Sequence, residues 1–156
     1  MTPLDPLDQA LITRARQLAI RAHEGQTRWG GEPFIVHPAA VASTFIDGYP
    51  AEYQIVSWLH DIVEDTEVTL EHLASHGFPP SVIEAIQALT HWPDEPYDQY
   101  IQRIGQASEL AIRVKLADLE HNLSTSTDKQ AKNKRIIWKL SRLYLQDQLR
   151  MKGLTP

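Results

Sequence analysis

Four ionisable residues lie close together in the segment SWLHDIVEDTE, residues 57–67. His60 and Asp61 are adjacent, and Glu64 and Asp65 follow one helical turn later, so a helix would place all four on one face. Ionisable groups beside so many apolar neighbours are costly to bury unless something compensates their charge. A divalent cation would do so, and imidazole with carboxylate suits Mn, Fe or Zn better than Ca. The alternative is an exposed acidic helix end.

A second polar group follows Ser108, where the spacing predicts a helix to about Leu123. Lys115, Asp118 and Asn122 fall on one narrow stripe of that helix, and apolar residues border the stripe on both sides. Such a helix is mostly buried, so its polar stripe should face a specific partner. The alternative is an internal ion pair between Lys115 and a nearby carboxylate.

A third group lies in GQTRWGGEPFIVHP, residues 25–38. His37 comes directly before Pro38 at the start of an expected helix, where its side chain could turn toward a metal ion. Arg28 and Trp29 lie on the glycine-rich loop, which could bring them over a ligand. Taken alone, His37 would more often be a helix cap than a ligand.

The elements that must position these residues are all predicted to be helices. Apolar residues recur at helical spacing throughout, and the alternation typical of strands is nowhere sustained. Proline and glycine separate the segments. We therefore expect an all-α bundle in a single domain over residues 1–156, with helices at about 6–22, 37–46, 51–63, 70–75, 80–90, 97–104, 108–123 and 128–152.

Composition narrows the class of protein. Hydrophobic residues make up 42% and charged residues 22%, which is typical of a globular domain. The absence of cysteine excludes disulfides and thiolate metal sites, so a metal ion must bind to nitrogen and oxygen. No apolar run approaches the roughly 20 residues that cross a bilayer. The start of the chain is acidic and broken by Pro3 and Pro6, unlike a signal peptide, so we expect a cytoplasmic protein without membrane contacts.

The net charge of −5 is unevenly distributed along the chain. Residues 1–128 contain 7 Lys and Arg against 19 Asp and Glu, whereas residues 129–156 contain 8 against 1. The basic end could be a helix packed on an acidic body, or it could offer cations to a phosphorylated ligand. The acidic body argues against binding long nucleic acid, which requires neutralisation of many phosphates, but not against a small nucleotide.

Three segments together, AHEGQTRWGGEPFIVHP, LHDIVEDT and VKLADLEHNL, resemble the hydrolase domain of RelA/SpoT-type alarmone enzymes within the HD superfamily. The likeness spans roughly residues 14–125 and keeps the order of the three motifs. From the length of 156 residues we expect the stand-alone small alarmone hydrolase form, without a synthetase domain. The resemblance implies an HD-domain helical bundle that removes the 3′-pyrophosphate of ppGpp or pppGpp.

The resemblance also implies roles for individual residues. The metal ligands would be His37, His60, Asp61 and Asp118. The metal would be Mn²⁺, although Fe²⁺ and Zn²⁺ share these ligands. Glu64 and Asp65 would orient and activate the attacking water.

For the substrate, Arg28 would contact the nucleobase and Asn122 the ribose. Lys115 would be a cation for the phosphates or an ion pair that holds Asp118. Trp29 departs from the basic or small residue that relatives often have, and its indole could instead stack on a purine.

Two further functions remain open at this point. Trp29 and the segment HWPDEPYDQY at 91–100 depart from the long bifunctional enzymes, so the substrate could be an adenosine alarmone, NADPH or another phosphorylated metabolite. The second open function is a nucleotide-sensing module that binds its ligand without turnover. The sequence predicts no oligomeric state.

The other histidines lack partners at ligand-like spacing. His23 is expected to fix the loop after the first helix, and a surface or structural place is expected for His72, His76, His91 and His121. Ordinary core positions are expected for Trp58, Trp138, Leu140, Leu143 and Leu145.

Overall fold

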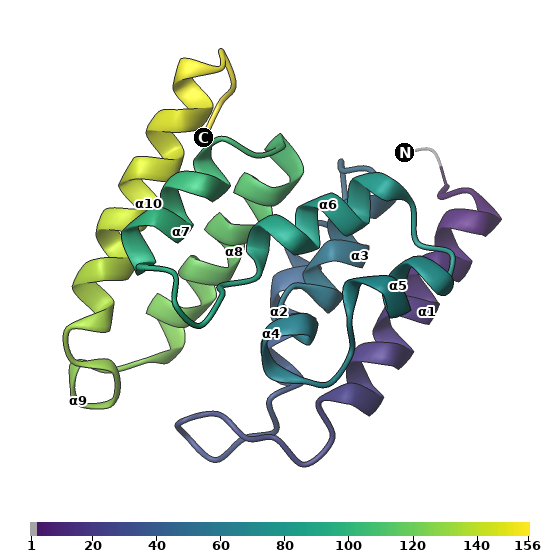
Figure 1. The fold of residues 1–156 in the computed structure, drawn as a ribbon, viewed down its shortest axis with the longest axis horizontal. Coiled ribbons are helices and arrows are strands. Elements are labelled where there is room, and N and C mark those ends of the chain that lie inside the picture. Colours follow the sequence, from purple (N-terminus) through teal and green to yellow (C-terminus); the bar gives the residue numbers. More distant parts are fainter. Residues whose placement is uncertain (1–2) are drawn as a thin grey trace.

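The computed structural model describes residues 3–156, and this range folds into helices joined by short loops (Figure 1). Within that range, strand-like pairing is confined to one isolated bridge between Thr27 and Pro33. In chain order the helices are α1 (Pro6–Ala22), α2 (Val36–Ser43), α3 (Ala51–Leu59), α4 (Ile62–Asp65), α5 (Leu70–Ser75), α6 (Pro80–Leu89), α7 (Tyr97–Gly105), α8 (Glu109–Thr125), α9 (Asp128–Ala131) and α10 (Lys134–Met151). The predicted all-α bundle is confirmed.

Helix α3 lies at the centre of the bundle. It packs against α1, α2, α6 and α8, and its residues Ile55, Val56 and Leu59 are almost completely buried. On the far side of α8, the long helix α10 packs against α7 and α8, at the left edge of Figure 1. One continuous hydrophobic core therefore connects the helices that carry the three polar groups.

The predicted helix over 51–63 is interrupted at His60 and Asp61. Helix α3 ends at Leu59 and α4 begins at Ile62, while Asp61 takes φ −103° and ψ 0°. The Asp65 N–H still donates to the Asp61 carbonyl at 3.0 Å, so the i,i+4 spacing is kept through the turn. For that reason apolar periodicity cannot reveal the break.

The predicted last helix is also divided, into α9 and α10. Lys132 adopts a positive φ of 35°, which ends α9. Arg135 then donates to the carbonyls of Leu123 and Ser126, which ties the start of α10 to the end of α8. This tertiary anchor, invisible in local sequence, sets the direction of α10.

Two core predictions on α10 are wrong. Trp138 and Leu145 are buried as expected, but Leu140 and Leu143 are 61% and 55% exposed. The reason is that α10 lies at the edge of the bundle, so α7 and α8 cover only one of its faces. Trp58, on α3, is only partly buried against the core.

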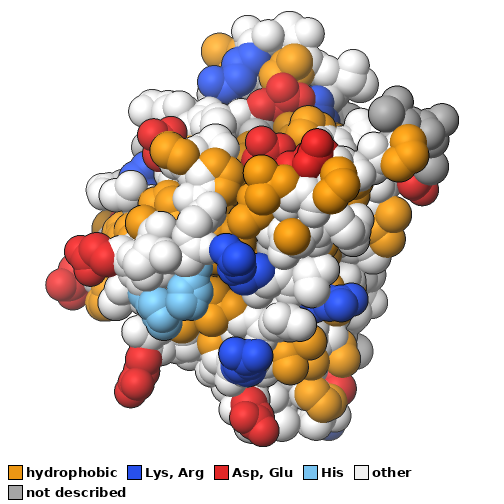
Figure 2. Space-filling view, turned by 90° about the vertical axis from the view of Figure 1, so that its right-hand side faces the viewer, with side chains coloured by type: hydrophobic (Ala, Val, Ile, Leu, Met, Phe, Trp, Pro, Cys, Tyr) orange, Lys and Arg blue, Asp and Glu red, His pale blue; other side chains and the backbone are white. Residues whose placement is uncertain are grey.

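The face of the molecule opposite α10, formed around α1 and α5, carries acidic, basic and apolar side chains side by side (Figure 2). It does not carry one sign of charge. Among residues 3–156, no helix combines the length and the apolar character that a membrane span requires.

A matched pair on α10 tests this packing. We expect Leu145→Ala to lower the free energy of unfolding by about 2–5 kcal/mol, because it leaves a cavity in the core. Leu143→Ala, the same change on the exposed face, should alter it by less than about 0.5 kcal/mol. Denaturant unfolding measures both; equal effects would contradict the placement of α10.

Candidate metal centre

Four side chains of ligand type converge from three parts of the fold. The structure brings one nitrogen or oxygen atom from each within 4.8 Å of the others, and the four residues are His37, His60, Asp61 and Asp118. All except Asp61 are buried. The structure thus brings together the four residues that the sequence analysis names as candidate ligands.

The helices bring these residues together through their contacts with α3. His37 lies in the first turn of α2 and Asp118 in the middle of α8, and both helices pack against α3. His60 and Asp61 occupy the turn at the end of α3. The His37 Nε2 atom lies 2.8 Å from Asp118 Oδ1 and 3.2 Å from His60 Nε2, so both rings present Nε2 to the same point.

The surroundings of His60 fix which of its nitrogens carries the proton. Its Nδ1 atom lies 2.7 Å from the Ser57 carbonyl, which can only accept, so Nδ1 must donate. In the neutral ring the lone pair is then on Nε2, which faces Asp61 Oδ2 at 3.1 Å. Burial by itself lowers the pKa of His60, but the charges of Asp61 and Asp118 outweigh it and raise that pKa well above its usual value.

Asp118 is held in place by two neighbours on its own helix. The Lys115 ammonium donates to Oδ2 at 2.8 Å, and the Asn122 amide donates to Oδ1 at 3.2 Å. Burial disfavours the Asp118 carboxylate, but Lys115 and then the histidines outweigh this effect and lower its pKa well below the usual value. Lys115 is thus engaged as the ion-pair partner of Asp118, the second of its two predicted roles.

The donor set fits a divalent cation. Two carboxylates and two imidazole nitrogens converge, while Lys115 supplies only one compensating positive charge on the far oxygen of Asp118. Nitrogen and oxygen donors of this kind are shared by Mn²⁺, Fe²⁺ and Zn²⁺. The cluster can therefore hold a metal ion, and its ligand chemistry leaves the choice among these metals open.

Glu64 and Asp65 lie on α4, just beyond Asp61. Their carboxylate oxygens and that of Asp61 lie within 4.8 Å of one another. Glu64 accepts a hydrogen bond from the His91 backbone N–H at 2.8 Å. Desolvation, followed by the negative charges of Asp61 and Glu64, raises the pKa of Asp65 to about 7. Two carboxylates thus stand beside the four-residue cluster without belonging to it.

A cleft of about 420 Å³ opens over the cluster. Among its lining residues are His37, Asp61, Asp118 and both α4 carboxylates, together with Arg28, Trp29, Lys115, Asn122 and Lys134. Every predicted site residue except His60 therefore lines one cleft. His60, the remaining member of the cluster, lies 3.2 Å from His37 through its Nε2 atom and does not line the cleft.

The glycine-rich loop forms one wall of that cleft because it is bonded to α8. Arg28 donates to Asn122 Oδ1 at 2.9 Å and to Thr125 Oγ1 at 3.2 Å, and the Trp29 indole N–H donates to the Thr125 carbonyl. The Arg28 guanidinium lies 4.4 Å from the centroid of the Trp29 ring. Arg28 is only 8% exposed, whereas Trp29 is 41% exposed.

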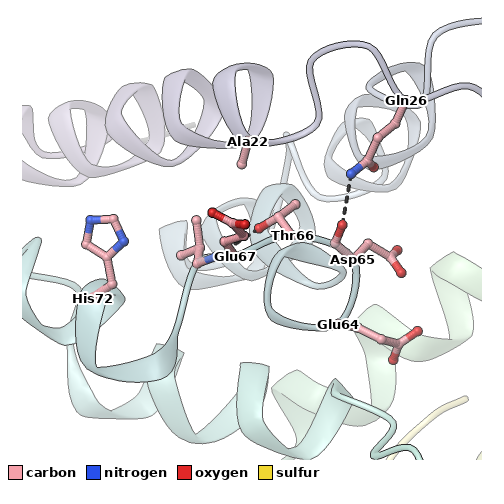
Figure 3. A pocket seen from close by; sticks show the side chains of 8 residues that line it. Ala22, Gln26, Glu64, Asp65, Thr66, Glu67 and His72 are labelled. Atoms are coloured by element: carbon pink, nitrogen blue, oxygen red, sulfur yellow. Dashed lines mark hydrogen bonds between the residues drawn. The ribbon is translucent and has the colours of Figure 1, made fainter.

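A second, larger cleft of about 770 Å³ meets the first at Glu64 and Asp65 (Figure 3). Gln26 lines the larger cleft, where its amide donates to the Asp65 carbonyl at 2.9 Å and its Oε1 atom lies 2.8 Å from His23 Nδ1. His23 is buried and packs against Phe34. As predicted, it fixes the loop that follows α1.

The sequence interpretation missed His121, which it placed among surface or structural histidines. Its Nδ1 atom lies 2.7 Å from His37 Nδ1, and the two rings stack with centroids 4.9 Å apart. Burial and then the neighbouring His37 lower the pKa of His121 to about 4. The available signal was its i,i+3 spacing from Asp118 on a buried helix. Of the others, His91 binds Glu64 through its backbone, and His72 packs on His76 away from the cluster.

Sequence comparisons relate the chain to alarmone enzymes. It is 35% identical to the bifunctional (p)ppGpp synthase/hydrolase SpoT of Escherichia coli K12 over 133 residues, which is 77% of this chain and 19% of SpoT. It is 37% identical over 125 residues to a probable guanosine-3′,5′-bis(diphosphate) 3′-pyrophosphohydrolase of Synechocystis, covering 74% of this chain and 16% of that protein. The chain thus spans about a fifth of the length of these relatives. No protein-family model matches it.

The structural comparison extends over the whole fold. A metazoan orthologue of SpoT that hydrolyses ppGpp superposes with a TM-score of 0.73, covering 99% of both chains at 21% identity. At that identity the match establishes the fold, and the sequence relatives supply the link to the family. The chain is therefore related in sequence and in fold to the SpoT/RelA-type proteins.

Proposed function

We propose that this chain is a metal-dependent hydrolase that removes the 3′-pyrophosphate of ppGpp or pppGpp and releases pyrophosphate with GDP or GTP. The observation that carries the proposal is a His/Asp cluster lining a cleft beside two further carboxylates. The relatives that bear this activity in their names support it. We further propose that residues 1–156 act as one phosphohydrolase domain.

The metal ion would be held by His37, His60, Asp61 and Asp118. We propose Mn²⁺, with Fe²⁺ and Zn²⁺ compatible with the same donors. When bound, such an ion neutralises phosphate charge and lowers the pKa of a water molecule. Lys115 and Asn122 would keep Asp118 ionised and correctly oriented.

Glu64 and Asp65 are proposed to handle the attacking water. Both carboxylates lie next to Asp61 yet outside the four-residue cluster, so they can orient a water and accept its proton. Their positions are fixed from outside α4: the His91 N–H binds Glu64, and Gln26 binds the Asp65 carbonyl.

Substrate recognition is proposed to use the loop wall of the cleft. Trp29 exposes part of its indole there, which suits stacking on a purine, and Lys134 adds a cation for phosphate on the same cleft. Arg28 and Asn122 remain proposed contacts to the base and the ribose.

One observation favours a second candidate, hydrolysis of another purine nucleotide such as an adenosine alarmone or NADPH. Both terminal nitrogens of Arg28 already donate to Asn122 and Thr125, and stacking on an indole does not distinguish guanine from adenine. A cytoplasmic location and a small-molecule nucleotide as substrate, without long nucleic acid or a membrane as partner, remain predictions of the sequence.

The purified protein with Mn²⁺ should release pyrophosphate from ppGpp. Asp61→Ala should abolish turnover, and Asp65→Asn should lower kcat by about 10²–10⁴-fold because it removes a proton acceptor. His76→Ala, at the residue that follows α5 and outside the lining of the cleft, is the control and should leave kcat unchanged. Product chromatography with a panel of guanosine and adenosine nucleotides measures turnover. Intact ppGpp after incubation with the metal-loaded protein would refute this substrate, and binding without turnover of any nucleotide would indicate a sensing module.

Metal removal gives a separate test. Dialysis against a chelator should abolish turnover, and added Mn²⁺ should restore it, because the ion would neutralise phosphate charge and lower the pKa of the attacking water. At 100-fold excess of Mn²⁺ over its Kd, the metal should stabilise the fold by about 2.7 kcal/mol. Calorimetric unfolding should show this increase in the free energy of unfolding for the wild type but not for His60→Ala. A gain that persists in His60→Ala would place the metal elsewhere.

Trp29→Ala should raise KM by about 5- to 150-fold, the equivalent of about 1–3 kcal/mol of stacking. Trp29→Phe keeps an aromatic face and should recover most of that loss. Steady-state kinetics decide the matter: a change in kcat with KM constant would contradict a role in stacking.

A further inference from the structure

His121 contacts a proposed metal ligand on the side away from the metal. Its ring stacks on that of His37 at an interplanar angle of 29°, and the two Nδ1 atoms are 2.7 Å apart. His37 Nε2, on the other side of its ring, faces Asp118 Oδ1 at 2.8 Å. His121 is therefore placed to act on the cluster only through His37.

Two imidazole nitrogens at hydrogen-bond distance require one donor and one acceptor. His37 must present an unprotonated Nε2 to bind a cation, so the proton of its neutral ring is on Nδ1. That Nδ1–H then donates to His121 Nδ1, which must be the acceptor. The proton of His121 is consequently on Nε2.

The same arrangement is present at the other histidine of the cluster. His60 Nδ1 lies 2.7 Å from the Ser57 carbonyl, so that ring is also held by an acceptor behind it. Metal-binding histidines generally donate their second N–H to such an acceptor, which fixes the tautomer and the orientation of the ring. At His60 the backbone provides this acceptor, whereas at His37 a side chain does.

We propose that His121 is a positioning residue that holds His37 in the Nδ1–H tautomer with Nε2 directed at the metal. The inference rests on the proposed metal site. His121 is not itself a ligand, because the nitrogen it directs toward the cluster is already engaged with the far nitrogen of His37. It belongs to α8, three residues after Asp118, so one helix supplies a ligand and orients another.

Two variants of similar size separate the hydrogen bond from packing. His121→Asn can place an amide oxygen near the position of Nδ1, whereas His121→Leu removes the acceptor. We expect titration calorimetry of the metal-free protein with Mn²⁺ to show a Kd raised 10- to 100-fold for His121→Leu and by less than about 3-fold for His121→Asn. His76→Leu and His76→Asn, the same changes at the residue that follows α5, should leave the Kd unchanged. Saturating Mn²⁺ should restore the kcat of His121→Leu.

The outcomes distinguish this inference from the proposed function. If the wild type binds none of Mn²⁺, Fe²⁺ and Zn²⁺, the metal site itself is wrong. If the wild type binds Mn²⁺ and both His121 variants bind it with the same Kd as the wild type, the positioning role is wrong.

A measurement on the wild type removes dependence on the folding of any variant. Nitrogen-15 spectra of the Zn²⁺-loaded protein should show the proton on Nδ1 of His37 and on Nε2 of His121. A proton on Nδ1 of His121 would overturn the proposal.

Discussion

The buried carboxylate of Asp118 imposes a requirement that much of the fold satisfies. An ionised group removed from water is costly unless charged and hydrogen-bonding partners replace the water. The Lys115 ammonium provides this at Oδ2, and the Asn122 amide provides it at Oδ1, which the His37 ring also faces. These contacts require α8 to be deeply buried with α2 and α3 packed beside it, so the packing of the core and the assembly of the site depend on each other.

Helices and a loop contribute different parts of the candidate site. The cluster is carried by helices and the turn after α3, and the histidines are oriented by the Ser57 carbonyl and His121 behind them. The glycine-rich loop forms the wall proposed for the substrate, and its bonds to Asn122 and Thr125 connect that wall to the helix of Asp118. The loop proposed for recognition and the cluster proposed for the metal are thereby connected through α8.

The charge asymmetry of the sequence has a structural basis. Helix α10 is basic and packs on α8 and α7, where Arg142 pairs with Glu120 on α8 and Arg135 binds the end of that helix. Only Lys134, at the start of α10, lines the cleft. The basic end is mainly a helix packed on an acidic body, and one of its cations is available to an anionic ligand.

By itself, the sequence determined the helical class and most helix positions, because apolar periodicity is a local property. The four residues of the cluster were predicted through the resemblance of three motifs to a known family. The break at His60 was missed because the i,i+4 spacing continues through it. The division before α10 was missed because the Arg135 bonds that anchor the start of α10 join it to the end of α8. Leu143 was misplaced because nothing in α10 alone tells which face its neighbours cover. Tertiary structure alone decided that His121 lies behind His37, because the two residues come from different helices. For His60 and Asp61, the sequence supplied two residues with ligand atoms. The packing of α2 and α8 on α3 brought His37 and Asp118 to them, and such convergence depends on long-range contacts that local sequence does not reveal.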